Sequence, residues 1–236
     1  MSPPTGPPTP QEVRRAARAA INIFESNDMT CCLFGSLACR VYGVTYRGPK
    51  DVDLIVLKDQ GYDSEELKQF LVDSDDRFCL VGSINPDATY QVLYFTLPSS
   101  LHDQDRKCKV DILTTGRTTS LNIPPIPRKH ITHVDPFTQD DNRLPVMPLL
   151  ALLMMKLQGW VDHRRSREGH KQKKVPQDVK DIDALVEIAV NDWEVHLENQ
   201  EERWLPRWFV NQSKKRVDEY LKKFPWKEED WESLGF

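Results

Sequence analysis

Residues 33–57 read LFGSLACRVYGVTYRGPKDVDLIVL and contain the features that decide the fold. Gly35 and Ser36 form a turn that should open a short helix, and a polar loop leads from it to Asp51 and Asp53. These aspartates enter a strongly apolar strand, in which side chains two residues apart leave the same face. At ~3.3 Å of rise per residue their Cα atoms would lie about 7 Å apart, so both carboxylates could reach shared cations.

A second apolar strand adds a third acid, Asp111, within the run KVDIL at 109–113. Carboxylates on core strands require a positively charged partner, because burying them unpaired is costly. A divalent metal ion is the simplest partner. The alternative is three surface or ion-paired acids on edge strands, which apolar neighbours such as Val52 and Ile112 disfavour.

The composition describes an ordinary globular protein: 236 residues, 39% apolar and 29% charged. The formal charge of −4 gives no overall attraction to nucleic acid or membrane, so any such attraction must be local. The five cysteines lack zinc-site spacing, which favours reduced core thiols. No apolar run approaches the ~20 residues of a membrane span, and the Pro-rich start resembles no signal peptide. We therefore expect no membrane partner and a cytoplasmic location, with a nuclear one as the alternative.

The pattern along the chain predicts an α/β (α+β) fold, with a mixed β-sheet core flanked by helices and a helical C-terminal half. We expect a disordered Pro-rich tail at 1–8, a core at 9–143 and a helical region at 144–236. A capping box of Thr9 and Glu12 should start the first helix. Further elements are expected as strands at 29–34, 52–57, 77–81, 90–97 and 107–113, one short strand near Ile131, and helices at 36–43, 64–72, 148–160, 177–190 and 214–224.

These motifs resemble the nucleotidyltransferase fold of the DNA polymerase β superfamily. Its signature is an apolar residue with Gly and Gly or Ser, a spacer, then Asp, an apolar residue and Asp or Glu; here Gly35-Ser36 and Asp51-Val52-Asp53 match, with Asp111 as the third acid. The spacer of fourteen residues is slightly long. Within the superfamily the chain is most similar to minimal nucleotidyltransferases, including the abortive-infection type. The further matches, within 30–190, are Tyr42-Gly43, Arg47, Lys156-Leu157 and the run 178–183.

The resemblance implies a Mg²⁺-dependent transfer of a nucleoside monophosphate from a triphosphate such as ATP to an acceptor hydroxyl, with release of pyrophosphate. Asp51 and Asp53 would hold two Mg²⁺ ions, for which Mn²⁺ could substitute. Asp111 would hold one of them and help to deprotonate the acceptor. Gly35, Ser36, Arg47 and Lys156 would bind the nucleotide. The alternatives are that Lys156 only snorkels to water and that Arg47 pins its loop to an acid.

The acceptor is open among RNA, a protein and a small molecule, with RNA slightly favoured. The run 164–174 carries six basic residues against one acid, which suits RNA or phosphate, although such runs are often solvated linkers. Lys180, Asp181 and Asp183 are expected to brace this loop through ion pairs. The six tryptophans crowd the second half, where helix packing is favoured over base stacking. Two other functions stay as alternatives: a catalytically inactive nucleotide- or RNA-binding module, and an antitoxin-like regulatory protein.

Overall fold

The computed structural model describes residues 6–57, 61–82, 90–98, 106–117, 119, 121–134, 143–199 and 203–236. A seven-stranded mixed sheet forms the centre of this part of the chain. Its strands are β1 (Cys31–Phe34), β2 (Asp51–Val56), β3 (Phe78–Gly82), β4 (Gln91–Thr96), β5 (Lys107–Thr114), β6 (Thr132–Val134) and β7 (Leu144–Val146). The helices are α1 (Pro10–Ser26), α2 (Gly35–Tyr42), α3 (Ser64–Ser74), α4 (Leu149–Arg165), α5 (Gly169–Gln172), α6 (Val175–Asn191), α7 (Arg207–Leu221) and α8 (Glu228–Ser233), with short 3₁₀ turns at Arg128–His130 and Pro225–Lys227.

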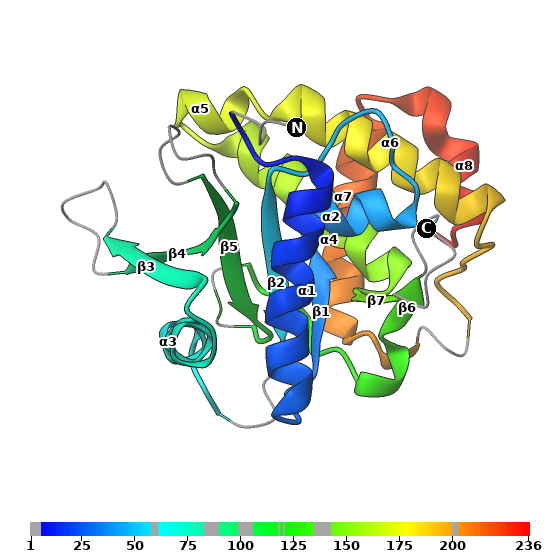
Figure 1. Cartoon of the computed structure of the whole chain (residues 1–236). Coiled ribbons are helices and arrows are strands. Elements are labelled where there is room, and N and C mark those ends of the chain that lie inside the picture. Colours follow the sequence, from blue (N-terminus) through cyan, green and yellow to red (C-terminus); the bar gives the residue numbers. More distant parts are fainter. Residues whose placement is uncertain are drawn as a thin grey trace.

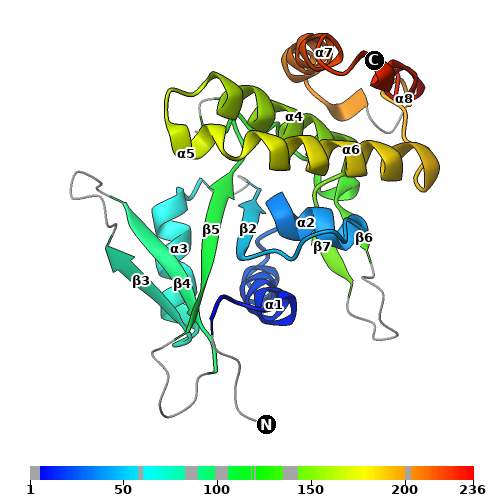
Figure 2. The ribbon, with the colours of Figure 1, turned by 90° about the horizontal axis from the view of Figure 1, so that it is seen from above.

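The strands run in the order β3-β4-β5-β2-β1-β7-β6. β2 pairs with β5 in parallel and with β1 in antiparallel orientation. One face of β2 and β5 is buried, at Val52, Leu54, Val110 and Ile112, whereas the opposite face carries the half-buried acids. Figure 2 shows α1 on one side of the sheet and α4 and α6 on the other side. The mixed sheet with flanking helices confirms the predicted fold class.

The two ends of the sheet differ in what covers them. In Figure 1, the β3–β4 hairpin extends away from the body, with α3 beside it, while α7 and α8 lie on the outside of α4 and α6. The C-terminal helices pack through aromatic side chains. Trp160 and Trp231 are buried, and the ring centroids of Trp160 and Tyr220 lie 5.0 Å apart. This packing agrees with the structural role expected for these two tryptophans, whereas Trp226 is 72% exposed.

Local sequence explains most element boundaries. The Thr9–Glu12 capping box starts α1 as expected, and a second one, Asp63 with Glu66, starts α3.

All five cysteines are free thiols, and four of them are buried. None of the described helices has the length and apolarity that a membrane span requires.

The structure differs from the expected elements at several places, including the unexpected helix α5 and the start of α7 at Arg207, which was expected near residue 214. β7 lies in the stretch that we expected to be helical from residue 144 onward, and it joins the sheet beside β1 through Leu33 and Val146. α8 was not expected either. In the N-terminal tail, residues 1–5 lie outside the described part, but the carbonyls of Gly6 and Pro7 accept hydrogen bonds from Arg106 at 3.1 and 3.2 Å.

Candidate active site

Two neighbouring parallel strands bring the three predicted acids together. Asp51 and Asp53 lie at the start of β2, and Asp53 is the register partner of Asp111 in β5. Because residues two apart share a face, Asp51 lies on the same face as the other two. All three are half-buried. The pairing of β2 with β5 therefore places the three acids next to one another on one face of the sheet, as we expected.

The turn before α2 is fitted closely against one of these acids. Gly35 has a φ of +66°, and a Cβ atom built on it would lie 1.8 Å from Oδ2 of Asp53. Only glycine satisfies both the backbone conformation and the contact. The next residue, Ser36, donates a long hydrogen bond from its hydroxyl to Oδ1 of Asp51 at 3.5 Å. The Gly-Ser turn and the acids thus form one local structure.

The surroundings of Asp53 disfavour its charged form. Burial raises the pKa of Asp53 to about 7, and the neighbouring charges of Asp51 and Asp111 add to this effect, while Lys156 and Lys109 oppose it. A carboxyl group in this condition is stabilised by a nearby cation.

One lysine on the same face was given no role by the sequence pattern. Lys109 donates from Nζ to Oδ2 of Asp111 at 2.6 Å, and its register partner is Asp51. Within the described ranges, no group of three or more His, Cys, Asp or Glu side chains is arranged to hold a metal ion. The Asp111 carboxylate is paired with Lys109 instead. The period of two between Lys109 and Asp111 is the signal that could have identified this residue.

Lys156 and Arg47, the two side chains predicted to bind the phosphates, both contact a fourth acid, Asp181 of α6. Lys156 contacts Oδ2 of Asp181 at 2.9 Å, and Arg47 contacts the same carboxylate at 2.6 and 3.1 Å. Tyr46 also donates to Asp181, and Gln177 reaches it at 3.3 Å. Burial would raise the pKa of Asp181, but Arg47, Lys156 and Tyr46 outweigh it and hold the pKa at about 2. Arg47 thus has the loop-pinning contact that was its alternative role.

The neighbouring acids of α6 bind other helices. Nδ1 of His163 in α4 lies 2.7 Å from Asp178, and Tyr220 in α7 donates to Asp183 at 2.9 Å. In the basic run, Arg164 and Arg165 both pair with Glu219 of α7. The expected bracing by Asp181 and Asp183 therefore applies to the Arg47 loop and to α7, with no contact to the basic run among the described residues.

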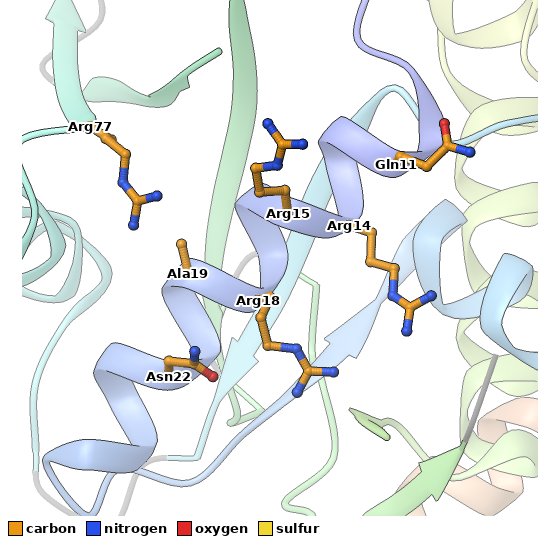
Figure 3. A pocket seen from close by; sticks show the side chains of 7 residues that line it. All are labelled: Gln11, Arg14, Arg15, Arg18, Ala19, Asn22 and Arg77. Carbon is orange, nitrogen blue, oxygen red and sulfur yellow. The ribbon is translucent and has the colours of Figure 1, made fainter. Parts of the chain in front are cut away.

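A separate groove lies on the outer surface of α1 and has a volume of about 350 Å³. Figure 3 shows four arginines around it, Arg14, Arg15 and Arg18 from α1 and Arg77 from the segment before β3. Arg18 donates to the carbonyl of Arg143, and Arg77 pairs with Asp75 at 2.6 Å. None of the three acids lines this groove, so it is separate from the candidate active site.

Comparison with solved structures places this fold among nucleotidyltransferases. An antigenic nucleotidyltransferase-like protein from Paracoccidioides brasiliensis is 13% identical, with a TM-score of 0.67 over 97% of this chain and 95% of that one. JHP933 from Helicobacter pylori is 12% identical, with a TM-score of 0.40 over 96% and 98%. The antibiotic-resistance factor ANT(2'')-Ia is 10% identical, with a TM-score of 0.41 over 86% and 94%. The comparison with curated proteins gives no match.

A sequence family described as "Nucleotidyl transferase AbiEii toxin, Type IV TA system" matches residues 35–205. The match begins at the glycine of the Gly-Ser turn and includes the three acids, Lys156 and Asp181. It covers more than half of the chain, so the protein belongs to this family and is a nucleotidyltransferase enzyme of the abortive-infection type. The expected resemblance is confirmed.

Proposed function

We propose that the protein transfers a nucleoside monophosphate from a triphosphate to an acceptor hydroxyl, using divalent metal ions held by Asp51, Asp53 and Asp111. The observation that carries this proposal is the register of Asp53 against Asp111, with Asp51 on the same face and the Gly35-Ser36 turn packed against them. Such a cluster of carboxylates has no structural use without positive charge.

The donor set fits magnesium, with manganese as a substitute, because both prefer oxygen ligands. The raised pKa of Asp53, caused by burial and two like charges, supports the proposal that a divalent ion would stabilise the cluster. Asp51 and Asp53 would hold the two ions, and Asp111 would help to hold one of them. When bound, the ions would supply the positive charge that stabilises the attacking and leaving oxygens of an in-line displacement.

The chain's own groups have distinct roles in this proposal. Ser36 offers its hydroxyl and backbone amide at the start of α2 to a phosphate. Lys156 and Arg47 would bind the triphosphate, in exchange for part of their contact with Asp181. Asp111 would accept the proton of the acceptor hydroxyl while the hydroxyl oxygen forms a bond to the α-phosphorus. The bond from that phosphorus to the β-phosphate oxygen breaks, and pyrophosphate leaves.

RNA is the acceptor that we favour slightly over a protein or a small molecule, on the basis of the basic run at 164–174. The description of the family as a toxin disfavours the antitoxin-like alternative. An inactive nucleotide- or RNA-binding module remains the rival. It would bind a triphosphate and leave it intact, whereas an enzyme would release pyrophosphate.

The proposal is tested by supplying each α-labelled triphosphate with Mg²⁺ and either total RNA or cell lysate, and identifying what becomes labelled. We expect one acceptor class to be labelled by the wild type. The Asp51→Asn and Asp53→Asn variants should be inactive, although their metal-free unfolding temperatures should be unchanged or higher because carboxylate repulsion is relieved. Near-wild-type labelling by either variant would refute the metal-dependent mechanism. Binding without any turnover by the wild type would favour the rival.

A further inference from the structure

We propose that Lys109 is a built-in counter-ion that occupies Asp111 in the metal-free protein and must release it before a divalent ion can bind. This inference rests on the proposed function, because it concerns the same three acids. It assigns a role to a residue that is not one of the proposed metal or nucleotide ligands. It also explains why the acids share a face of the sheet and yet form no ready-made metal group in the described part of the chain.

The position of Lys109 is fixed by the strand. It precedes Asp111 by two residues in β5, so both side chains leave the same face. Across the parallel ladder its register partner is Asp51, while Asp53 is the partner of Asp111. These four residues thus form two adjacent register pairs, and the Lys109 side chain leaves the same face of the sheet as the three acids. Its Nζ atom lies 2.6 Å from Oδ2 of Asp111, a short charge-assisted contact.

The charges around this lysine have the arrangement of a substitute for a metal ion. Its ammonium carries one positive charge, and Asp51, Asp53 and Asp111 share the face of the sheet from which it leaves. Among the described residues, Lys109 is the cation that pairs directly with one of the three acids. It supplies a single positive charge to a cluster that could accept more.

The same contact is built so that it can be broken. The side chain of Lys109 is 42% exposed and that of Asp111 is 34% exposed, so both already contact water. A lysine side chain is flexible, and an exposed ion pair contributes little to stability. Lys109 should therefore weaken metal binding without preventing it. Metal would then load most readily together with the triphosphate, whose negative charge compensates for the ammonium.

Binding of Mn²⁺ in the absence of nucleotide tests the inference, followed by the loss of the free-ion signal in electron paramagnetic resonance. Removing one positive charge about 5 Å from a dication should lower the dissociation constant about tenfold in the Lys109→Met variant. Lys109→Arg, which keeps the charge, should stay within about twofold of the wild type. The matched control is Lys107→Met, since Lys107 lies on the same face of β5 and pairs in register with Thr96 away from the acids.

Two further measurements distinguish a failure of this inference from a failure of the proposed function. If Asp51→Asn leaves Mn²⁺ affinity unchanged, the acids do not hold metal, and both the proposed function and this inference fall. If Asp51→Asn weakens binding but Lys109→Met does not strengthen it, only the inference falls. Lys109→Gln keeps a polar group beside Asp111 and should show the same gain, should Lys109→Met fold poorly. Equal affinity of wild type and Lys109→Gln would also overturn the inference.

Discussion

At the scale of single residues, the arrangement of the acids depends on a glycine as well as on the charged groups themselves. Gly35 combines a positive φ with the close approach of the Asp53 carboxylate, and Gly43, at the other end of α2, has a positive φ without such an approach. A Cβ atom on Gly43 would meet Cδ1 of Ile188 at 3.7 Å, an ordinary contact. This pair of glycines separates the effect of backbone conformation from the effect of space at the acid.

Replacing Gly35 by alanine should therefore abolish transfer, whereas Gly43→Ala should retain it. Both changes carry the left-handed backbone penalty of about 1–2 kcal/mol. Gly35→Ala must in addition move the Asp53 carboxylate, because the added methyl group would overlap it. Unfolding free energies from urea titration and transfer rates from labelled triphosphate check this. Equal activity of the two variants would show that the fit between Gly35 and Asp53 does not matter.

That the three acids and the Gly-Ser turn lie together could be predicted from local sequence, because the spacing of the acids and their apolar context are visible there. What their neighbours contact could not. The pairing of Arg47 with Asp181 joins residues 134 positions apart, and no periodicity links them. Lys109 is different, since its spacing from Asp111 is local. No role is expected for it from the sequence, because a lysine near the end of a strand is usually solvated.

At the scale of elements, α1 is fastened to the start of β5 by a buried ion pair. Arg106 contacts the two carboxylate oxygens of Glu12 at 2.7 and 2.9 Å, and both side chains are at most 10% exposed. The hydrogen bonds from Arg106 lower the pKa of Glu12 to about 2, against the opposing effect of burial. The same carboxylate completes the capping box of α1 with Thr9. The ion pair therefore joins the helix start to the strand that carries Asp111.

Breaking this pair with Glu12→Gln should destabilise the protein by about 3 kcal/mol at pH 7, because Arg106 would remain buried without its counter-charge. A carboxyl group whose pKa is lowered by folding stabilises the fold above its unfolded pKa. That stabilisation is lost as the pH falls through the folded value. The difference between wild type and variant should thus shrink from about pH 5 to about pH 2. Urea titrations across this range measure it.

A constant difference down to pH 3 would mean that the negative charge of Glu12 is not what stabilises the fold. The double variant Glu12→Leu/Arg106→Met provides the matched control, because replacing both charges by apolar groups is often nearly neutral. Its stability should be close to that of the wild type and should not show this pH dependence.

Element boundaries were predictable to within one residue at the starts of α1 and α4 and at both ends of β2. The end of α4 at Arg165 lies five residues beyond the expected position. β7 was not predictable, for a physical reason. It has only three residues, one of them Pro145, and it becomes a strand through its pairing with β1 and β6. A strand made by its neighbours leaves little local signal.

At the scale of the whole molecule, the net charge of −4 is unevenly distributed. Positive charge gathers in the groove on α1 and in the basic run at 164–174, on different elements (Figures 1 and 3). Part of the basic run is neutralised, because Glu219 pairs with Arg164 and Arg165, and Glu168 pairs with Lys171. Lys173 and Lys174 are exposed at the start of α6. They directly precede the turn in which Gln177 contacts the Asp181 cluster.

Lys173 and Lys174 are therefore the basic residues best placed to guide an RNA acceptor. If the acceptor is RNA, Lys173→Gln/Lys174→Gln should raise its KM and reduce the salt dependence of that KM by about 1.4 in logarithmic slope, since each lost contact with a single strand removes about 0.7. The matched control Arg164→Gln/Arg165→Gln should change the slope far less, because Glu219 already occupies these guanidinium groups. The KM for the triphosphate should stay constant in both variants. Initial rates measured between low and physiological salt would decide, and an unchanged slope in the lysine variant would point to a protein or small-molecule acceptor.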